Sequence, residues 1–64
     1  MIQNSIKQLR QEQSITQEEL AQLCHVSRQT IIAVEKGNYT PSLLLAMQIA
    51  SVFKLPVEKI FKII

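Results

Sequence analysis

The sequence has few of the residues from which catalytic, metal and phosphate sites are built. Its 64 residues include no aspartate, one histidine, one cysteine and one glycine. This set does not supply a nucleophile, a base and an orienting group together, so we expect no enzyme. Zinc needs about three or four protein ligands, and Cys24 and His25 are only two, so we expect no metal site. With Gly37 as the only glycine there is no glycine-rich phosphate loop, and we expect no cofactor.

The sequence also lacks the signals of secretion and membrane insertion. A lone cysteine cannot form an internal disulfide framework, which suits a reducing cytosol. The apolar runs are far shorter than the roughly 20 residues that span a bilayer. Lys7 and Arg10 follow rather than precede any apolar stretch, so no signal peptide is expected. We therefore predict a cytoplasmic protein with no membrane partner.

The length of the chain limits its organisation. A domain of this size buries only about 60% of its extended-chain surface. Because 47% of the residues are hydrophobic, a compact core without covalent staples is still possible. We predict one domain over residues 1–64, with no second domain for sensing a small-molecule effector.

The distribution of charge says more than the net charge of +2. Between Glu19 and Glu58 the only acid is Glu35. The cations of this segment are Arg28, Lys36 and Lys54. If Glu35 is neutralised internally, the segment presents no free negative charge, as a surface facing phosphates requires.

A short helical pattern covers about residues 17–24. Thr16 and Glu19 precede it at the spacing of a capping box, in which each side chain accepts from the other's backbone N–H. The apolar residues that then share one helical face are Leu20, Leu23 and Cys24. We expect this face, with Cys24 as a small core residue, to be buried.

A second helical pattern follows after a tight polar connection. Ser27 caps a helix over residues 28–36 that stops at Gly37, a residue suited to the left-handed position after a helix. Ile31 and Val34 form its buried stripe. The residues on its other side are Arg28, Gln29, Ile32, Ala33 and Lys36. A short helix with one apolar stripe and an Arg-Gln pair in its first turn suits the major groove of DNA, and the pair of helices is a helix-turn-helix pattern.

Three further helices complete a compact five-helix, all-α bundle. The first covers about residues 4–13, the fourth begins at a Thr40 cap with Pro41 in its first turn, and the fifth covers about residues 56–61. The inward positions of the first are Ile6, Leu9 and Arg10. Those of the fourth, which runs to residue 53, are Leu43, Ala46, Met47, Ala50 and Phe53. Residues 1–3 and 61–64 either fray or pair as a small two-stranded ribbon, and propensity does not decide between these outcomes.

Four segments carry a resemblance to a known family. They read Thr16-Gln17-x-Glu19-Leu20-Ala21, Val26-Ser27-Arg28-Gln29-Thr30-Ile31, Glu35-x-Gly37 and Pro41-Ser42-Leu43. The chain resembles the Cro/C1-type (xenobiotic-response-element) helix-turn-helix family. It is similar to compact single-domain repressors such as the cytolysin regulators of Gram-positive bacteria. Two positions depart from the pattern: His25 stands where the family usually has glycine, and Ile32 where it has a small polar residue.

The resemblance implies a lambda-repressor-like fold and two polar roles. It implies a salt bridge between Arg10 on the first helix and Glu35 at the end of the third. It also gives Gln17 a hydrogen bond to a DNA phosphate. His25 is expected in the left-handed turn position, which histidine tolerates at modest cost. Similar compact repressors carry a ribbon that joins the termini.

The predicted contacts with double-stranded DNA come from the second and third helices and the loop after them. They are Gln17, Ser27, Arg28, Gln29, Thr30, Ile32, Ala33, Lys36, Asn38 and Tyr39. Arginine can bind guanine and glutamine can bind adenine through two hydrogen bonds each, and an apolar group can touch a thymine methyl. The alternative is a set of solvated helix and turn residues, with Ile32 packed at the edge of the domain.

The C-terminal third predicts a homodimer, because a helix of about six residues cannot bury all of its apolar side chains. The residues assigned to the dimer interface are Leu44, Leu55, Val57, Ile60, Phe61, Ile63 and Ile64. The alternative is that the last two isoleucines cover the domain's own core, and Ile60 can also serve that core.

The functional prediction is a sequence-specific transcriptional regulator. We predict a homodimeric repressor that reads a pseudo-palindromic operator in the major groove and acts by occupancy. The other hypothesis is an antitoxin-like protein-interaction module with secondary DNA binding. Such proteins usually append a disordered tail, and the end of the chain at Ile64 counts against that hypothesis.

Overall fold

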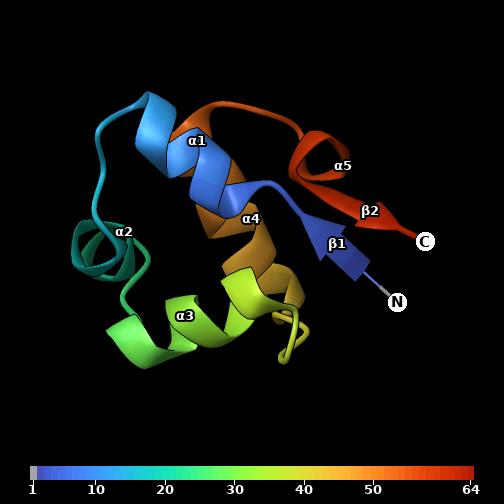
Figure 1. Cartoon of the computed structure of the whole chain (residues 1–64), viewed down its shortest axis with the longest axis horizontal. Helices are drawn as coiled ribbons and strands as arrows, with labels where there is room; N and C mark the ends of the chain where they lie inside the picture. Colours follow the sequence, from blue (N-terminus) through green and yellow to red (C-terminus); the bar gives the residue numbers. More distant parts are fainter. Residues whose placement is uncertain (1) are drawn as a thin grey trace.

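Five short helices and a two-stranded antiparallel sheet form residues 2–64, which is the part of the chain that the structure, a computed structural model, describes (Figure 1). The elements are β1 (Ile2–Asn4), α1 (Ile6–Glu12), α2 (Gln17–Leu23), α3 (Arg28–Lys36), α4 (Leu43–Phe53), α5 (Val57–Ile60) and β2 (Phe61–Ile63). The helices surround a core that draws on all five of them. Its buried members are Ile6, Leu20, Ala21, Cys24, Ile31, Val34, Leu45, Ile49, Ala50, Phe53 and Ile60.

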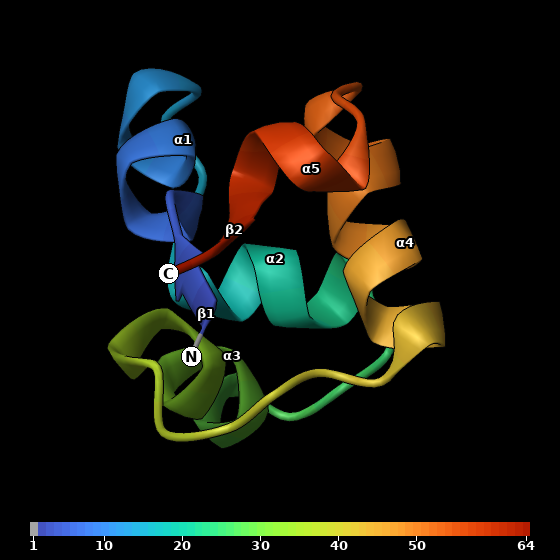
Figure 2. The same cartoon turned by 90° about the vertical axis from the view of Figure 1, so that its right-hand side faces the viewer.

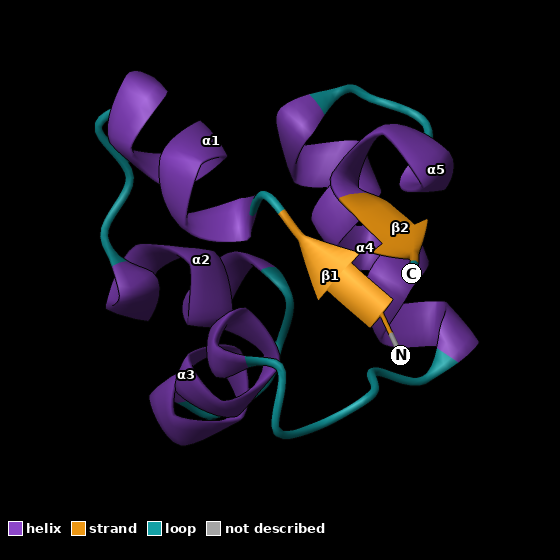
Figure 3. Ribbon diagram, turned by 45° about the vertical axis from the view of Figure 1, so that its right-hand side comes forward, coloured by secondary structure: helices purple, strands orange, loops and turns teal. Residues whose placement is uncertain are grey.

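The chain ends pair as a ribbon, so the all-α prediction is only approximately right. Asn4 lies opposite Phe61, and the pairing continues to Ile2 opposite Ile63. Figure 3 shows β1 and β2 side by side, with this ribbon next to α5. Met1, the first residue of the segment for which fraying and pairing were both open, lies outside the described residues.

Helix α1 begins two residues later than predicted, because Asn4 belongs to β1 and its side chain bonds to the backbone of Val34 and Ile6. The Asn4 Nδ2 donates to the carbonyl oxygen of Val34 at 2.8 Å, and its Oδ1 accepts from the N–H of Ile6 at 3.2 Å. The N–H of Ser5 donates to the carbonyl oxygen of Ile60. These bonds keep Asn4 in β1, next to β2, and α1 begins only after the Ser5 N-cap position.

The exposed face of α4 differs from the prediction. Ser42, not Thr40, caps this helix, and its Oγ accepts from the N–H of Leu45 at 3.1 Å. The inward positions are Leu45, Ala46, Ile49, Ala50 and Phe53. Leu43 and Met47, predicted to be in the core, are 74% and 56% exposed. Nearly every residue in the first two turns is apolar, so sequence periodicity alone does not select the buried stripe.

Helices α1 to α4 end in the same way, although the sequence has one glycine. The left-handed residues after them are Ser14, His25, Gly37 and Lys54, with φ between 57° and 79°. In each case the next N–H donates to the carbonyl oxygen five positions earlier, at 2.9–3.1 Å. This is a Schellman motif, which reverses the chain and satisfies helix-end carbonyls. Three of the four left-handed positions are not glycine, so each carries the steric cost that a side chain has in this conformation.

Candidate nucleic-acid interface

The α2–α3 unit is fixed by the end signals that the sequence predicts. The Thr16 Oγ1 accepts from the N–H of Glu19 at 3.0 Å, and the Glu19 carboxylate accepts from the N–H of Thr16 at 2.8 Å. Hydrogen bonding of the Glu19 carboxylate to Thr16, first to its backbone N–H and then to its side chain, lowers the pKa of Glu19 below its ordinary value. The Ser27 Oγ accepts from the N–H of Thr30 at 3.2 Å and begins α3. His25 occupies the left-handed position between the helices, as predicted.

One residue of α2 was assigned to the wrong face. Cys24 is 1% exposed, and burial raises the pKa of its thiol. Leu23, which was predicted to share its face, is 57% exposed. The buried stripe of α2 instead includes Ala21, which lies beside Leu20. Both sets fit a helical spacing, and the packing of the bundle decides between them.

Helix α3 presents a polar outer surface. Ile31 and Val34 are buried, at 0% and 1% exposure. The outer residues Arg28, Gln29 and Lys36 are exposed, and Ile32 and Ala33 are half-buried between the two surfaces. The sequence therefore places its Arg-Gln pair on the solvent side of α3.

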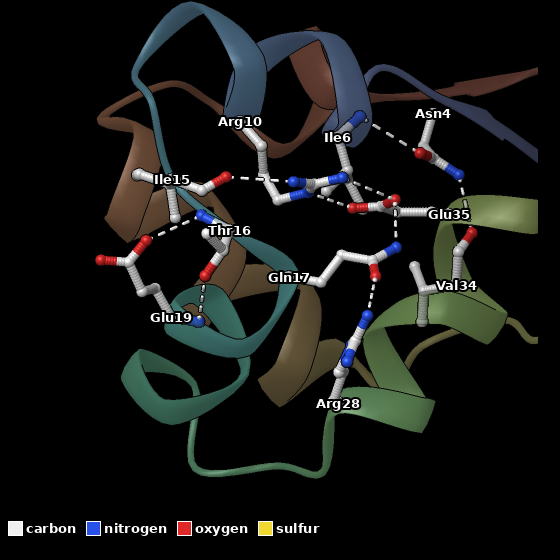
Figure 4. Close-up of polar contacts among 10 residues, drawn as sticks. All are labelled: Asn4, Ile6, Arg10, Ile15, Thr16, Gln17, Glu19, Arg28, Val34 and Glu35. Carbon is white, nitrogen blue, oxygen red and sulfur yellow. Dashed lines mark hydrogen bonds and ion pairs between the residues drawn. The ribbon is translucent and has the colours of Figure 1, made fainter.

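The structure contains the ion pair that the resemblance implies between α1 and α3. The Arg10 Nε lies 2.5 Å from the Glu35 Oε2, and the Arg10 Nη2 donates to Oε1 at 3.2 Å (Figure 4). The side chains are 10% and 6% exposed. The remaining terminal nitrogen of Arg10 donates to the carbonyl oxygen of Ile15 at 3.0 Å. Glu35 is thus neutralised internally. This neutralisation is needed if the segment between Glu19 and Glu58 is to face phosphates without a free negative charge.

Gln17 connects this ion pair to the outer surface of α3. Its Nε2 donates to the Glu35 Oε1 at 3.2 Å, and its Oε1 accepts from the Arg28 Nη2 at 3.5 Å. Figure 4 shows Gln17 between these two side chains. Because an ionised carboxylate only accepts hydrogen bonds, Glu35 determines that the amide nitrogen of Gln17 points inward and its oxygen toward Arg28. Sequence reasoning missed this connection, since its bonds span 18 and 11 positions.

The loop after α3 folds back toward the helix. The N–H groups of Gly37 and Asn38 donate to the carbonyl oxygens of Val34 and Ala33 at 3.0 and 3.1 Å. The reversal leaves Asn38 exposed and Tyr39 48% exposed. The chain then runs past the end of α3 to the start of α4 (Figure 2).

The predicted dimer residues separate into three groups by their exposure. Ile60 is fully buried, so its place is in the core and its assignment to an outer surface is wrong. Val57 and Phe61 are half-buried and pack against that core. The exposed members are Leu44, Leu55, Ile63 and Ile64. Leu43 and Met47 on α4 join them as exposed apolar residues that the sequence interpretation had placed inside.

Two further features concern metal binding and membrane insertion. Among residues 2–64, no three His, Cys, Asp or Glu side chains are grouped as a metal ion would need. No helix within the same residues has the length and apolar character to cross a bilayer.

Comparisons with known proteins agree with this geometry. The profile of the helix-turn-helix family matches residues 6–60. An uncharacterised HTH-type transcriptional regulator of Methanocaldococcus jannaschii is 52% identical over 60 residues, which are 94% of this chain and 91% of that protein. Another such regulator, from Bacillus subtilis, is 43% identical over the same shares of both chains.

A solved structure also resembles the fold. The restriction-modification controller protein C.AhdI from Aeromonas hydrophila superimposes with a TM-score of 0.78 and 26% sequence identity, over 84% of this chain and 82% of that one. The short sheet and the five helices described above are thus variations on a lambda-repressor-like arrangement. The chain belongs to the Cro/C1-type helix-turn-helix family of DNA-binding transcriptional regulators.

Proposed function

We propose that this chain is a homodimeric repressor that reads a pseudo-palindromic operator through the outer face of α3. The observation that carries the proposal is the polar surface of α3, whose own carboxylate, Glu35, is neutralised by Arg10. The exposed charged groups of α3 itself are therefore the cations Arg28 and Lys36, as binding to a phosphate backbone requires.

Within this proposal, the two residues at the start of α3 read bases. Arg28 can donate two hydrogen bonds to guanine, and Gln29 can bind a base edge through its amide. Arg28 is held toward α2 by Gln17 at 3.5 Å, so its guanidinium is oriented before DNA binds. This orientation lowers the entropy lost on binding. Gln17 keeps a second amide hydrogen, which is available to a phosphate.

The remaining predicted contacts surround these readers. Thr30 and Ser27 lie at the start of α3, and their hydroxyls are 2.9 Å apart. Lys36 and Asn38 lie at its exposed C-terminal end. We assign these residues to the DNA backbone, where contacts position a protein without specifying sequence.

A second copy covers the exposed apolar residues of the C-terminal half. We assign to this interface Leu43, Leu44, Met47, Leu55, Ile63 and Ile64, all of them at least 36% exposed. A patch of this kind on a small domain marks an interaction site. Two-fold symmetry makes the patch self-complementary and sets the two α3 helices about 34 Å apart, one turn of DNA. With both half-sites occupied, the dimer represses by excluding polymerase.

Selection of bound sites from random duplex DNA tests the proposal. The expected result is an enriched pseudo-palindrome whose half-sites are separated by about one helical turn. A protein carrying both Arg28→Ala and Gln29→Ala serves as the control and should enrich no such site. Enrichment of the same site by wild type and control would contradict the assignment of α3 as the reading element.

A further inference from the structure

A shallow depression lies on the outer side of α3, next to the loop that follows it. Its lining residues are Ser27, Gln29, Thr30, Ala33 and Tyr39. Four of them belong to α3 or its cap. Tyr39 joins them because the left-handed Gly37 reverses the chain, with Asn38 bonded back to Ala33 at 3.1 Å. The depression is therefore a joint product of the recognition helix and its C-terminal turn.

The polar groups in this depression are not equally available. The Ser27 and Thr30 hydroxyls are 2.9 Å apart, and the Ser27 oxygen also accepts from the Thr30 N–H. Within residues 2–64 no side-chain hydrogen bond involves Gln29, whereas its neighbour Arg28 is bonded to Gln17. The Gln29 amide thus lies without a side-chain partner in a depression that Ala33 and Tyr39 also line.

We propose that this depression receives the 5-methyl group of a thymine in the major groove. Thymine presents a methyl group beside the O4 acceptor on its major-groove edge, and no other base of unmodified DNA carries that methyl. The methyl packs between Ala33 and Tyr39 while the Gln29 amide donates to O4. In this arrangement Tyr39 helps to select the base, and its role is not a contact with the DNA backbone. The inference rests on the proposed function, since it needs α3 to enter the groove.

Replacing thymine by uracil tests this assignment, because uracil keeps O4 and lacks only the methyl. Each thymine of one half-site of the selected operator is changed in turn, and wild-type affinity is measured by titration. At one thymine the loss should be about fourfold, the equivalent of leaving one methyl group unburied. Tyr39→Ala should bind the thymine and uracil duplexes equally. Tyr39→Phe, which keeps the ring, should retain the difference.

The controls separate the possible failures. An unchanged denaturant midpoint in Tyr39→Ala shows that the variant is folded. The inference is overturned if no thymine is sensitive, or if full sensitivity persists in Tyr39→Ala. A uniform loss of affinity in Tyr39→Ala for operator and scrambled duplex alike also overturns it, because that result identifies a backbone contact. If any of these results is obtained while the wild-type protein still binds the operator tightly, the inference falls and the proposed function stands. If wild type has no preferred duplex, both claims fall together.

Discussion

The two longest helices, α3 and α4, begin and end alike but present opposite outer surfaces. Each has a serine cap and a left-handed residue after its last turn. The exposed side of α3 carries Arg28, Gln29 and Lys36. The exposed side of α4 carries Leu43, Leu44 and Met47. The same local signals therefore build two helices for two different partners, which we propose to be DNA and a second copy of the chain.

The helices also differ in how they are held. Helix α4 is packed through an apolar stripe. Helix α3 has a similar stripe and, in addition, directional bonds from three other elements: Arg10 of α1, Gln17 of α2 and Asn4 of β1. Hydrogen bonds fix orientation more narrowly than apolar contacts do. A helix that must present side chains to base edges needs that rotational precision, and a helix in an apolar interface needs less of it.

The largest expected effect is the loss of one member of the buried ion pair. Arg10→Met should lower the free energy of unfolding by about 3–5 kcal/mol, because Glu35 is left as a buried unpaired charge. Leu44→Ser on α4 should change the stability of the monomer by about 0.5 kcal/mol or less. Denaturant unfolding measures both. Combining Arg10→Met with Glu35→Leu should recover part of the loss, and strict additivity would show that the pair does not interact.

Changes to the outer face of α3 should affect DNA binding without affecting the fold. Arg28→Ala and Gln29→Ala should each weaken operator binding by about 1–3 kcal/mol, since each removes a base contact that we propose. Titration against operator and scrambled duplexes measures the loss, and thermal unfolding verifies the fold. Unchanged operator affinity in both variants would show that α3 does not enter the major groove.

Changes to the outer face of α4 should have the reverse pattern. Leu44→Glu should weaken self-association at least about tenfold, because a carboxylate loses its hydration in an apolar interface. Sedimentation equilibrium measures the association. Leu23→Glu is the matched control, since Leu23 is a similarly exposed leucine outside the proposed interface. Equal effects of the two substitutions, or a wild-type chain that stays monomeric at micromolar concentration, would contradict the assignment.

The Schellman motif that ends helices α1 to α4 predicts two smaller changes in stability, which have opposite signs. His25→Gly should stabilise the protein by about 0.5–1 kcal/mol, since glycine adopts the left-handed conformation without steric cost. Gly37→Ala should destabilise it by about 1 kcal/mol, although no heavy atom lies within 4 Å of the added methyl group. Denaturant midpoints of the two variants decide the matter. A loss of stability in His25→Gly would mean that the imidazole makes a contact worth more than the strain.

The smallest effect concerns the cap of α2. The bonds from Thr16 lower the pKa of Glu19 in the folded state, so its charge stabilises the fold above the ordinary value of 4.5. That contribution is lost as the pH falls through the lowered pKa. Glu19→Gln, which keeps the capping geometry, should be less stable than wild type at pH 6 and nearly equal to it near pH 3. Urea unfolding midpoints of both proteins at the two pH values check this. If the difference between the two midpoints is the same at both pH values, the charge of Glu19 is not its cause.

Local signals were enough to predict α2, α3 and the turn between them. Thr16, Ser27 and Gly37 each act on backbone groups within a few residues, so their effects can be read from the sequence. The stripe of α4 could not be selected, because apolar side chains occupy almost all of its first positions and the rest of the bundle chooses among them. The Asn4 bond to Val34, which spans 30 positions, has no local signature. The ribbon likewise depends on α5 returning the chain beside β1.

The central claim is that the outer face of α3 binds DNA while the outer face of α4 does not. Backbone amide chemical shifts of the nitrogen-15-labelled protein, recorded during titration with the selected duplex, test this most directly. The account predicts the largest changes at Arg28, Gln29 and Ala33 and in the loop after Gly37, with little change along the exposed side of α4. Large changes at Leu43, Leu44 and Met47, with α3 unaffected, would contradict it.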